Sequence, residues 1–214
     1  MGVNKEKYFE IIKTLDQSKV TLIAVSKTKS PEQIQLLYDL GQRDFGENYV
    51  QELVSKQEAL PKDIRWHFIG HLQTNKVKFI APFVYMIQGV DSLKLLQEIN
   101  KLAIKNNRKI KCLLQVHIAT EETKFGLDDH ELESIMKEEH IDTLSGVEVC
   151  GLMGMASFTS NIKQVKEEFK KLKLLFDKYT SLKILSMGMS ADYTTAIEVG
   201  STMVRIGSLL FGER

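Results

Sequence analysis

The sequence alternates from end to end between short apolar runs rich in branched residues and longer segments whose apolar residues recur at helical spacing. Short apolar runs bounded by turn signals are typical of buried strands, and a spacing of three and four residues is typical of amphipathic helices. The alternation therefore predicts a parallel sheet whose strands are joined by helices. Eight strands are expected, at residues 20–27, 44–48, 65–70, 85–90, 111–118, 147–155, 182–187 and 203–208.

Eight strands that alternate with helices predict an α/β fold, and within that class they favour a single (β/α)₈ TIM barrel. An extra N-terminal helix is indicated by Tyr8, Ile11, Ile12 and Leu15. A doubly wound open sheet is the alternative, but it usually has a glycine-rich turn after its first strand, where this chain has Ser-Lys-Thr-Lys at 26–29. No linker or change of composition divides the chain, so we expect one domain over residues 1–214.

The charge of the chain argues against a general nucleic-acid or acidic-membrane surface, because 29 Lys and Arg nearly balance 28 Asp and Glu. No apolar run has the length of a signal peptide core or a membrane span, so we expect a cytoplasmic protein without a membrane partner. Cys112 and Cys150 each lie in an apolar run, which favours buried reduced thiols. The spacing of Cys and His predicts no metal site.

Lys27 stands at the end of the first expected strand, where a barrel of this kind carries its functional residues. Ile23, Val25 and Lys27 share one face of that strand, so if the branched residues point inward, Lys27 does too. The alternative is a lysine whose amine extends along its own aliphatic stem to solvent. An amine held inside would lose water, which favours its neutral form and makes it a candidate for Schiff-base formation.

Two loops near the end of the sequence have the composition of a phosphate site. The loop after the seventh expected strand contains Met189 and Ser190, and the one after the eighth contains Gly207 and Ser208. Backbone N–H groups of such turns and of a helix N-terminus favour anions, and these two loops are the recurrent phosphate site of the barrel. Alternatively, Ser190 is only a helix cap and Gly207 only a tight turn. Opposite a strand-end lysine, the two loops suggest a carbonyl compound that carries a phosphate.

Three further polar residues lie on or beside expected strands. Arg205 is flanked by apolar residues on the last strand, so its charge needs either a buried acidic partner or a ligand. Asn48 ends the second strand and could hydrogen-bond a ring substituent of the ligand, although Asn is also a frequent helix cap. His67, in the third strand, is a candidate for the site or a satisfied core histidine, and His117 is a weaker candidate.

Several blocks of the sequence resemble the signature motifs of the pyridoxal phosphate homeostasis proteins. The blocks are AVSKTK (24–29), FGENYVQE (45–52), WHFIGHLQTNK (66–76), SMGMS (186–190) and GSTMVRIG (200–207). They follow one another through nearly the whole chain, and several are long and specific. The resemblance implies a single-domain barrel similar to the N-terminal domain of bacterial alanine racemase, holding pyridoxal 5′-phosphate as an internal aldimine.

The resemblance also implies a role for each matching residue. Lys27 would be the aldimine lysine, and Arg205 would face the pyridine nitrogen. Asn48 would line the ring. The phosphate would rest against the hydroxyl of Ser190 and the two last loops. The predicted cofactor-binding set is Lys27, Asn48, His67, Met189, Ser190, Arg205, Gly207 and Ser208.

Members of this family are regarded as carriers or regulators of the cofactor, which implies a protein that buffers or delivers pyridoxal phosphate without turnover. An arginine at the ring nitrogen weakens the electron sink, and the sequence ends at Arg214 with no residues for a second domain that could bring a tyrosine base. We therefore expect no catalytic residue, a monomer, and apo PLP-dependent enzymes as partners. The alternatives are a small PLP-dependent racemase, a Schiff-base lyase, and a scaffold with an incidental ligand.

Overall fold

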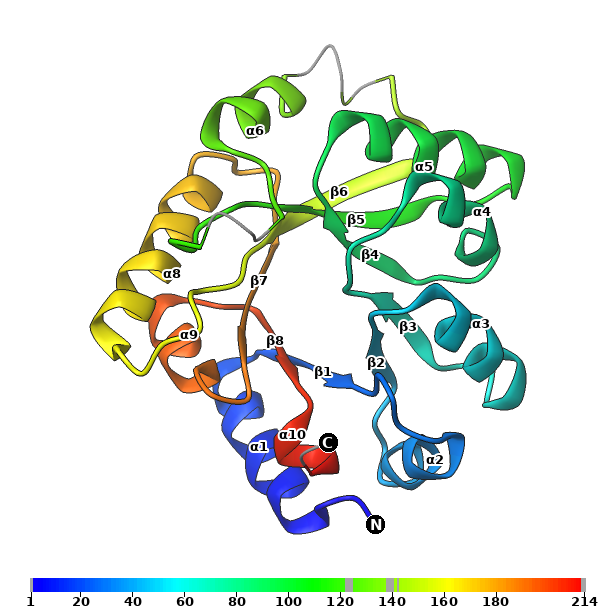
Figure 1. The fold of residues 1–214 in the computed structure, drawn as a ribbon, viewed down its shortest axis with the longest axis vertical. Coiled ribbons are helices and arrows are strands. Elements are labelled where there is room, and N and C mark those ends of the chain that lie inside the picture. The colour runs from blue at the N-terminus through cyan, green and yellow to red at the C-terminus, as the bar shows by residue number, and fades with distance from the viewer. Residues whose placement is uncertain (1, 122–124, 138–140, 142, 213–214) are drawn as a thin grey trace.

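Eight parallel strands close into a barrel in chain order, with β8 paired to β1 (Figure 1). The computed structural model of the protein describes residues 2–121, 125–137, 141 and 143–212. Helices lie between successive strands and surround the barrel, while α1 packs beside α10 near the two labelled termini (Figure 1). The predicted barrel with an additional N-terminal helix is confirmed, and the open sheet is excluded.

The elements follow the predicted order, and their ends differ from the prediction by a few residues. The strands are β1 (Thr21–Val25), β2 (Asp44–Glu47), β3 (Arg65–Phe68), β4 (Met86–Val90), β5 (Ile110–Gln115), β6 (Val147–Met153), β7 (Ile184–Met189) and β8 (Met203–Ile206). The helices are α1 (Lys5–Ser18), α2 (Pro31–Asp39), α3 (Val50–Ala59), η1 (Thr74–Lys76), α4 (Val77–Ile80), α5 (Leu93–Lys105), α6 (Asp129–Ile135), α8 (Ile162–Asp177), α9 (Tyr193–Val199) and α10 (Ser208–Phe211).

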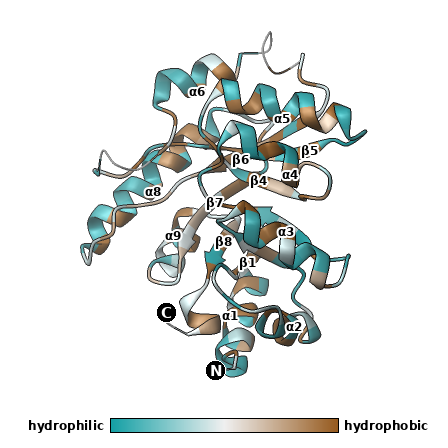
Figure 2. Cartoon of the chain, turned by 45° about the vertical axis from the view of Figure 1, so that its right-hand side comes forward, coloured by the Kyte–Doolittle hydropathy of each residue, from teal (hydrophilic) through white to brown (hydrophobic). Residues whose placement is uncertain are grey.

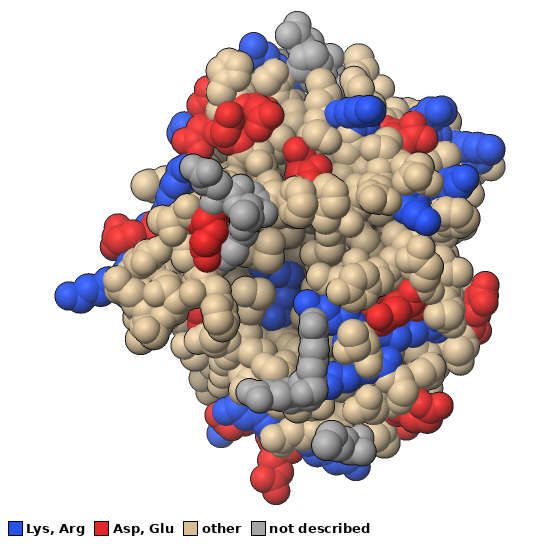
Figure 3. Space-filling view, in the orientation of Figure 1, with Lys and Arg blue, Asp and Glu red and all other residues tan. Residues whose placement is uncertain are grey.

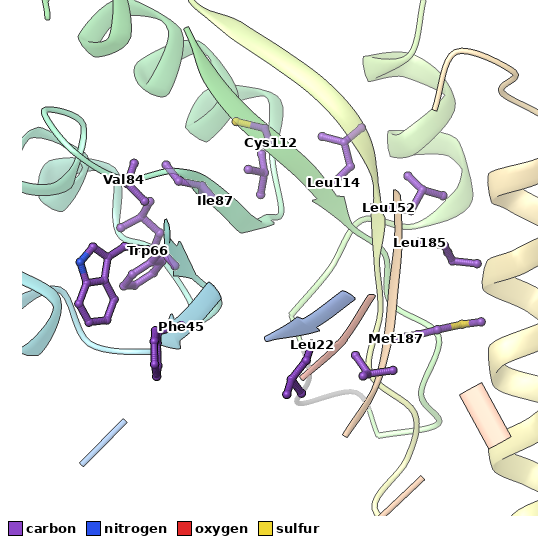
Figure 4. Close-up of a cluster of buried hydrophobic side chains, with 14 of the residues drawn as sticks. Leu22, Phe45, Trp66, Val84, Ile87, Cys112, Leu114, Leu152, Leu185 and Met187 are labelled. Atoms are coloured by element: carbon purple, nitrogen blue, oxygen red, sulfur yellow. The ribbon is translucent and has the colours of Figure 1, made fainter. Parts of the chain in front are cut away.

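The strands divide their side chains between two apolar clusters because successive residues of a strand point to opposite faces. The larger cluster lies between the barrel and its helices, and Figure 4 shows its strand side chains, Leu22, Phe45, Ile87, Leu114 and Leu185 among them. Figure 2 shows the matching pattern in the helices, which are apolar toward the strands and polar outside. The smaller cluster fills part of the barrel interior and contains Ile23, Met86, Leu113, Cys150, Met153 and Met203.

Local signals in the sequence set several helix ends. Ser30 and Gln33 form a capping box before α2, with Pro31 at the first helical position as predicted. Asp128 caps α6 by accepting a hydrogen bond from the Glu131 backbone N–H, 2.7 Å away. These caps satisfy N–H groups that a helix start would otherwise leave without partners, so the helices begin where the sequence predicts.

Two expectations about elements are wrong. The last strand was expected to run to Ser208, but β8 ends at Ile206 and Ser208 begins the short helix α10. The spacing of Ile162, Val165, Phe169 and Leu172 predicts one buried helix stripe, yet Ile162 is the first residue of α8 and its side chain is 68% exposed.

Composition and residue spacing also predicted the state of the thiols and bore on membrane-spanning segments and metal sites. Cys112 and Cys150 are free and buried, and burial raises the pKa of the Cys150 thiol to about 12. Every helix within residues 2–121, 125–137, 141 and 143–212 is too short or too polar to span a lipid bilayer. The described Cys, His, Asp and Glu side chains form no group of three that could hold a metal ion.

Gly151 is a position in β6 where the backbone of the neighbouring strand β7 approaches closely. The register between β5 and β6 shifts by one residue just before it, which brings its Cα against the carbonyl group of Ile184 in β7. A Cβ at this position would lie 1.7 Å from that carbonyl oxygen. Only glycine therefore allows β6 and β7 to pair at this point, since backbone atoms cannot move aside as a flexible side chain can.

We predict that Gly151→Ala lowers the free energy of unfolding by about 3 kcal/mol, because the added methyl group forces the paired strands apart. Urea unfolding followed by circular dichroism measures the loss. The matched control is Gly2→Ala, where an added Cβ meets nothing within 4 Å. Equal stability of the two variants would contradict the close approach of β6 and β7.

Candidate functional site

A cavity of about 960 Å³ lies at the carboxyl ends of the strands, where a barrel of this kind carries its functional residues. The face drawn in Figure 3 is hollowed near its centre, and Lys and Arg side chains gather in and beside the hollow. The cavity is lined from the segments that follow β1, β2, β3, β6, β7 and β8. It brings together seven of the eight predicted site residues, namely Lys27, Asn48, Met189, Ser190, Arg205, Gly207 and Ser208.

Lys27 lies in a tight turn directly after β1. The Lys29 backbone N–H donates to the Ser26 carbonyl group over 3.0 Å and closes the turn. Thr28 adopts the left-handed backbone conformation with φ 64°, which is unfavourable for a branched residue and needs support from its surroundings. Its N–H donates to Glu52 Oε2 over 2.8 Å. The half-buried side chain of Lys27 therefore enters the cavity from a turn that other elements hold in place.

A buried ion pair supports this turn from the side of α3. Lys56 Nζ lies 2.8 Å from Glu47 Oε1 and 2.8 Å from Glu52 Oε2, and it also donates to the Ser26 carbonyl group over 2.9 Å. The Ser26 hydroxyl donates to Glu47 Oε1 over 2.6 Å. The side chain of Glu47 is fully buried and that of Lys56 is 6% exposed. The ammonium group thus ties the end of β1 to β2 and α3.

Burial raises the pKa of Glu47, and the charge of Lys56 with the hydrogen bonds from Lys56 and Ser26 offsets only part of that effect. The second carboxylate oxygen, Oε2, is buried without a hydrogen-bond partner, which fits a carboxyl group in a dry environment. The ion pair therefore depends on Lys56, because a carboxylate left alone in this position would be strongly unfavourable.

Arg205 forms part of the cavity wall although it is only 4% exposed. Its Nη1 donates to the Ser186 hydroxyl over 2.6 Å and to the Ser186 carbonyl over 2.9 Å, and its Nη2 donates to the Gly154 carbonyl over 2.9 Å. Burial lowers the pKa of Arg205 to about 10, while Asp192 opposes the effect. The sequence left open whether Arg205 has a buried acidic partner. The hydrogen bonds of its guanidinium group go to carbonyl and hydroxyl oxygens.

Asn48 offers an unused polar atom beside the cavity. Its Oδ1 is buried and has no hydrogen-bond partner, a state that is costly for an amide oxygen. Gly70 passes so close that a Cβ there would lie 2.4 Å from the Asn48 carbonyl oxygen, so the strand ends of β2 and β3 hold Asn48 tightly. An amide fixed in this way is suited to a polar group on a bound molecule.

The two serine-bearing loops meet at the cavity, where Gly207 lies beside Val25 at the end of β1. The Gly207 backbone N–H donates to Ser190 Oγ over 3.2 Å, which joins the loop after β7 to the loop after β8. Ser208 follows directly and also lines the cavity. Asp192 fixes the first loop by accepting a hydrogen bond from the Met189 backbone N–H. Hydroxyl and backbone N–H groups thus gather where the sequence predicts an anion site.

His67 is the predicted site residue that the cavity does not include. It is 1% exposed inside the barrel, where its Nε2 lies 3.1 Å from Asp44 Oδ1 and its Nδ1 lies 3.1 Å from Gln88 Nε2. Burial lowers the pKa of His67, and Asp44 opposes the effect. Both ring nitrogens are therefore occupied within the barrel, which is the core histidine that the sequence left as the alternative. His117 likewise lies outside the cavity lining and contacts the Glu121 carbonyl group.

Sequence reasoning missed the rim that follows β6. Glu168 of α8, 7% exposed, accepts hydrogen bonds from the Ser157 backbone N–H and hydroxyl at 2.6 and 2.7 Å. This carboxylate fixes the loop that carries Phe158, whose side chain is 93% exposed at the cavity rim. A glutamate on an otherwise apolar helix stripe was the available signal. It becomes informative only when the loop that it binds is known.

Comparisons with known proteins show what the chain as a whole is similar to. A family model described as the alanine racemase N-terminal domain matches residues 5–214. The pyridoxal phosphate homeostasis protein of Aquifex aeolicus (strain VF5) is 44% identical over 199 residues, which cover 90% of this chain and 86% of the relative. The protein of that name from Homo sapiens is 42% identical over 215 residues, 90% of this chain and 76% of the relative.

A solved structure shows the same likeness in three dimensions. PipY of Synechococcus elongatus PCC7942, solved with PLP bound, superposes with a TM-score of 0.88 at 33% sequence identity. The match covers 97% of this chain and 99% of that chain. The likeness therefore extends over the whole barrel, the cavity included.

We predict that Lys56→Met costs about 3 kcal/mol of unfolding free energy near pH 8, because it leaves the Glu47 carboxyl group buried without its cation. Because the pKa of Glu47 is higher in the folded than in the unfolded protein, its contribution to stability is fully present below the ordinary pKa of 4.5. That contribution is lost as the pH rises through the pKa of the folded protein. The loss should therefore shrink as pH falls toward 4.5. Denaturant titrations at several pH values measure it.

The matched control is Lys166→Met, which removes an exposed lysine paired with Glu198 at 2.9 Å. Exposed pairs contribute little, so its effect should be small at every pH. The double variant Lys56→Met/Glu47→Leu should recover most of the lost stability. A loss independent of pH would show that Glu47 is not the group responsible.

Proposed function

Because this chain belongs to the alanine racemase N-terminal domain family, and within it to the pyridoxal phosphate homeostasis proteins, we propose that it binds pyridoxal 5′-phosphate and buffers or delivers that cofactor. The observation that carries the proposal is the meeting of Lys27, Arg205 and two serine-bearing loops in one cavity. The likeness to PipY, solved with PLP bound, supports it. We take residues 1–214 as one cofactor-binding domain.

The cavity fits the functional groups of this cofactor. The buried Asn48 Oδ1 has no hydrogen-bond partner among the described residues and is suited to the substituted pyridine ring. Arg205 supplies N–H donors at the cavity wall for the ring nitrogen. Ser190, Ser208 and the nearby backbone N–H groups would receive the phosphate, which such loops favour. His67 is withdrawn from the proposed cofactor set because its ring nitrogens are occupied inside the barrel.

Lys27 is the proposed attachment point. Its neutral amine would attack the aldehyde carbon, so that a carbon–nitrogen bond forms and the aldehyde oxygen leaves as water, giving a Schiff base. The supported turn around Lys27 holds the amine in the cavity, and this preorganisation reduces the entropy lost on binding. A reversible bond of this kind suits a protein that must also release the cofactor.

We propose that the bound cofactor is held without turnover. An arginine donor at the ring nitrogen would leave that nitrogen unprotonated, which weakens the ability of the ring to withdraw electrons. A racemase also needs a second acid–base group across the ring from the lysine. The described side chains that line the cavity include no Tyr, His, Cys or Glu. Asp192, the one acid among them, already accepts the Met189 backbone N–H.

Delivery requires that another protein can reach the cofactor. The rim residues Phe158 and Ile162 are 93% and 68% exposed. The cavity therefore opens directly to solvent beside apolar side chains. We propose apo PLP-dependent enzymes as the recipients.

We predict that the protein loaded with pyridoxal phosphate is yellow, and that Lys27→Ala abolishes the Schiff-base absorbance. Borohydride reduction followed by peptide mass mapping should place the modified amine at Lys27. The matched control is Lys29→Ala, because Lys29 lines the same cavity but donates to the Phe211 and Gly212 carbonyl groups, each over 3.3 Å. Labelling at Lys29, or a yellow Lys27→Ala protein, would overturn the assignment.

We further predict no α-proton exchange above the rate of free pyridoxal phosphate when the loaded protein is incubated with alanine in deuterated water. Proton NMR of the alanine α-position measures the exchange. A rate many orders of magnitude faster, as enzymes reach, would favour the racemase instead. A lyase that works without the cofactor would be colourless and would still depend on Lys27.

A further inference from the structure

A continuous row of hydrogen bonds crosses the barrel interior from the cavity to the amino ends of the strands. Arg205 Nη1 contacts Ser186 Oγ at 2.6 Å, and Ser186 Oγ contacts Gln88 Oε1 at 2.7 Å. Gln88 Nε2 contacts His67 Nδ1 at 3.1 Å, and His67 Nε2 contacts Asp44 Oδ1 at 3.1 Å. Arg65 holds Asp44 from the far end with two hydrogen bonds. These six side chains, from five strands, form what we name the polar column.

The polar column has a single consistent arrangement of protons. A guanidinium group can only donate, so Ser186 Oγ accepts from Arg205 and its own proton points to Gln88 Oε1. Gln88 therefore presents its NH₂ group to His67, whose Nδ1 must be the acceptor. The histidine proton is left on Nε2, where it donates to the Asp44 carboxylate. The identity of each donor thus follows from Arg205 together with the orientation of the Gln88 amide, whose Oε1 faces Ser186.

The column lies in a dry environment, where a broken link is costly. Gln88 and Ser186 are fully buried, His67 is 1% exposed and Arg205 is 4% exposed. Burial acts to raise the pKa of Asp44, but its bonds with Arg65 and His67 outweigh burial and lower that pKa. Asp44 is therefore a fixed acceptor that keeps the Nε2 proton in place. Turning any member would leave a buried donor or acceptor without a partner.

We propose that Gln88 and His67 are positioning residues for Arg205, which keep the Ser186 hydroxyl turned as an acceptor toward the guanidinium group on the cavity wall. The arrangement leaves His67 neutral and fixes the guanidinium group of Arg205 at the cavity wall. The expected effect of the polar column on cofactor binding rests on the proposed function, whereas the arrangement of protons in the column does not.

The first test reads the proton arrangement in the protein without any ligand. Nitrogen NMR of histidine-labelled protein distinguishes the two neutral tautomers, and His67→Phe assigns the His67 signals. We expect a neutral ring with its proton on Nε2 between pH 6 and 8. The charged and titratable groups that face His67 are Asp44 of β2, Arg65 of β3, Lys111 of β5 and Tyr85 before β4. A proton on Nδ1 would overturn the proposal.

The second test replaces the amide of Gln88 by a carboxylate. In Gln88→Glu both neighbours of His67 can only accept, so the ring should carry protons on both nitrogens at pH 7. In the loaded protein the proton gained by His67 offsets part of the added charge, but the carboxylate lies closer to Arg205 along the column than the ring does. The pH midpoint of the Schiff-base absorbance should therefore still rise, by about half a unit, because a nearby negative charge favours the protonated form. An unchanged His67 signal and an unchanged midpoint would contradict the positioning role.

The third test uses Gln88→Met, which keeps the volume but removes the link. The dissociation constant for pyridoxal phosphate should rise about fivefold, the effect of losing one hydrogen bond of ordinary strength. The matched control is Met153→Leu, a change inside the same barrel interior without a polar contact in the column. Equal effects of the two variants on the midpoint and the affinity would show that only packing matters. Failure of the wild type to take up pyridoxal phosphate would instead refute the proposed function.

Discussion

The polar column is the constraint on which both the barrel interior and the cavity wall depend. All of its groups except the exposed Arg65 are buried, and a buried donor or acceptor without a partner costs about 1–3 kcal/mol, so the links hold one another in place. Its members come from β2, β3 and β4 and from β7 and β8, two groups of paired strands that meet across the interior because the sheet is closed. Closing the barrel in the correct register therefore assembles the column and sets Arg205 at the cavity in the same step.

Lys27 is held from a different direction. The turn that carries it rests on Glu47, Glu52 and Lys56, whose contacts lie between β1, β2 and α3 rather than inside the barrel. The amine and the guanidinium group of the cavity are thus fixed by two separate sets of buried charges. Both sets include one end of the short strand β2, Asp44 in the polar column and Glu47 beside the Lys27 turn, so this strand connects them.

The cavity as a whole gathers groups that support the proposed binding role. It offers an amine, a guanidinium group, an orphaned amide oxygen and hydroxyl-bearing loops, which correspond to the groups of one phosphorylated aldehyde. The proposed carrier role follows from this inventory together with the exposed rim at Phe158. Family membership supports that reading because relatives that span most of this chain are named for pyridoxal phosphate homeostasis.

The sequence by itself determined the barrel, the order of its elements and the placement of Lys27, Ser190 and Arg205 at strand ends, because periodicity and turn chemistry are local properties. It could not decide between the site and the core for His67, since the answer depends on Asp44 and Gln88 from neighbouring strands. No pattern in the sequence indicated that Lys56 supports the turn that carries Lys27. Contacts between residues far apart in the chain exist only after closure of the sheet, so tertiary structure alone fixed them.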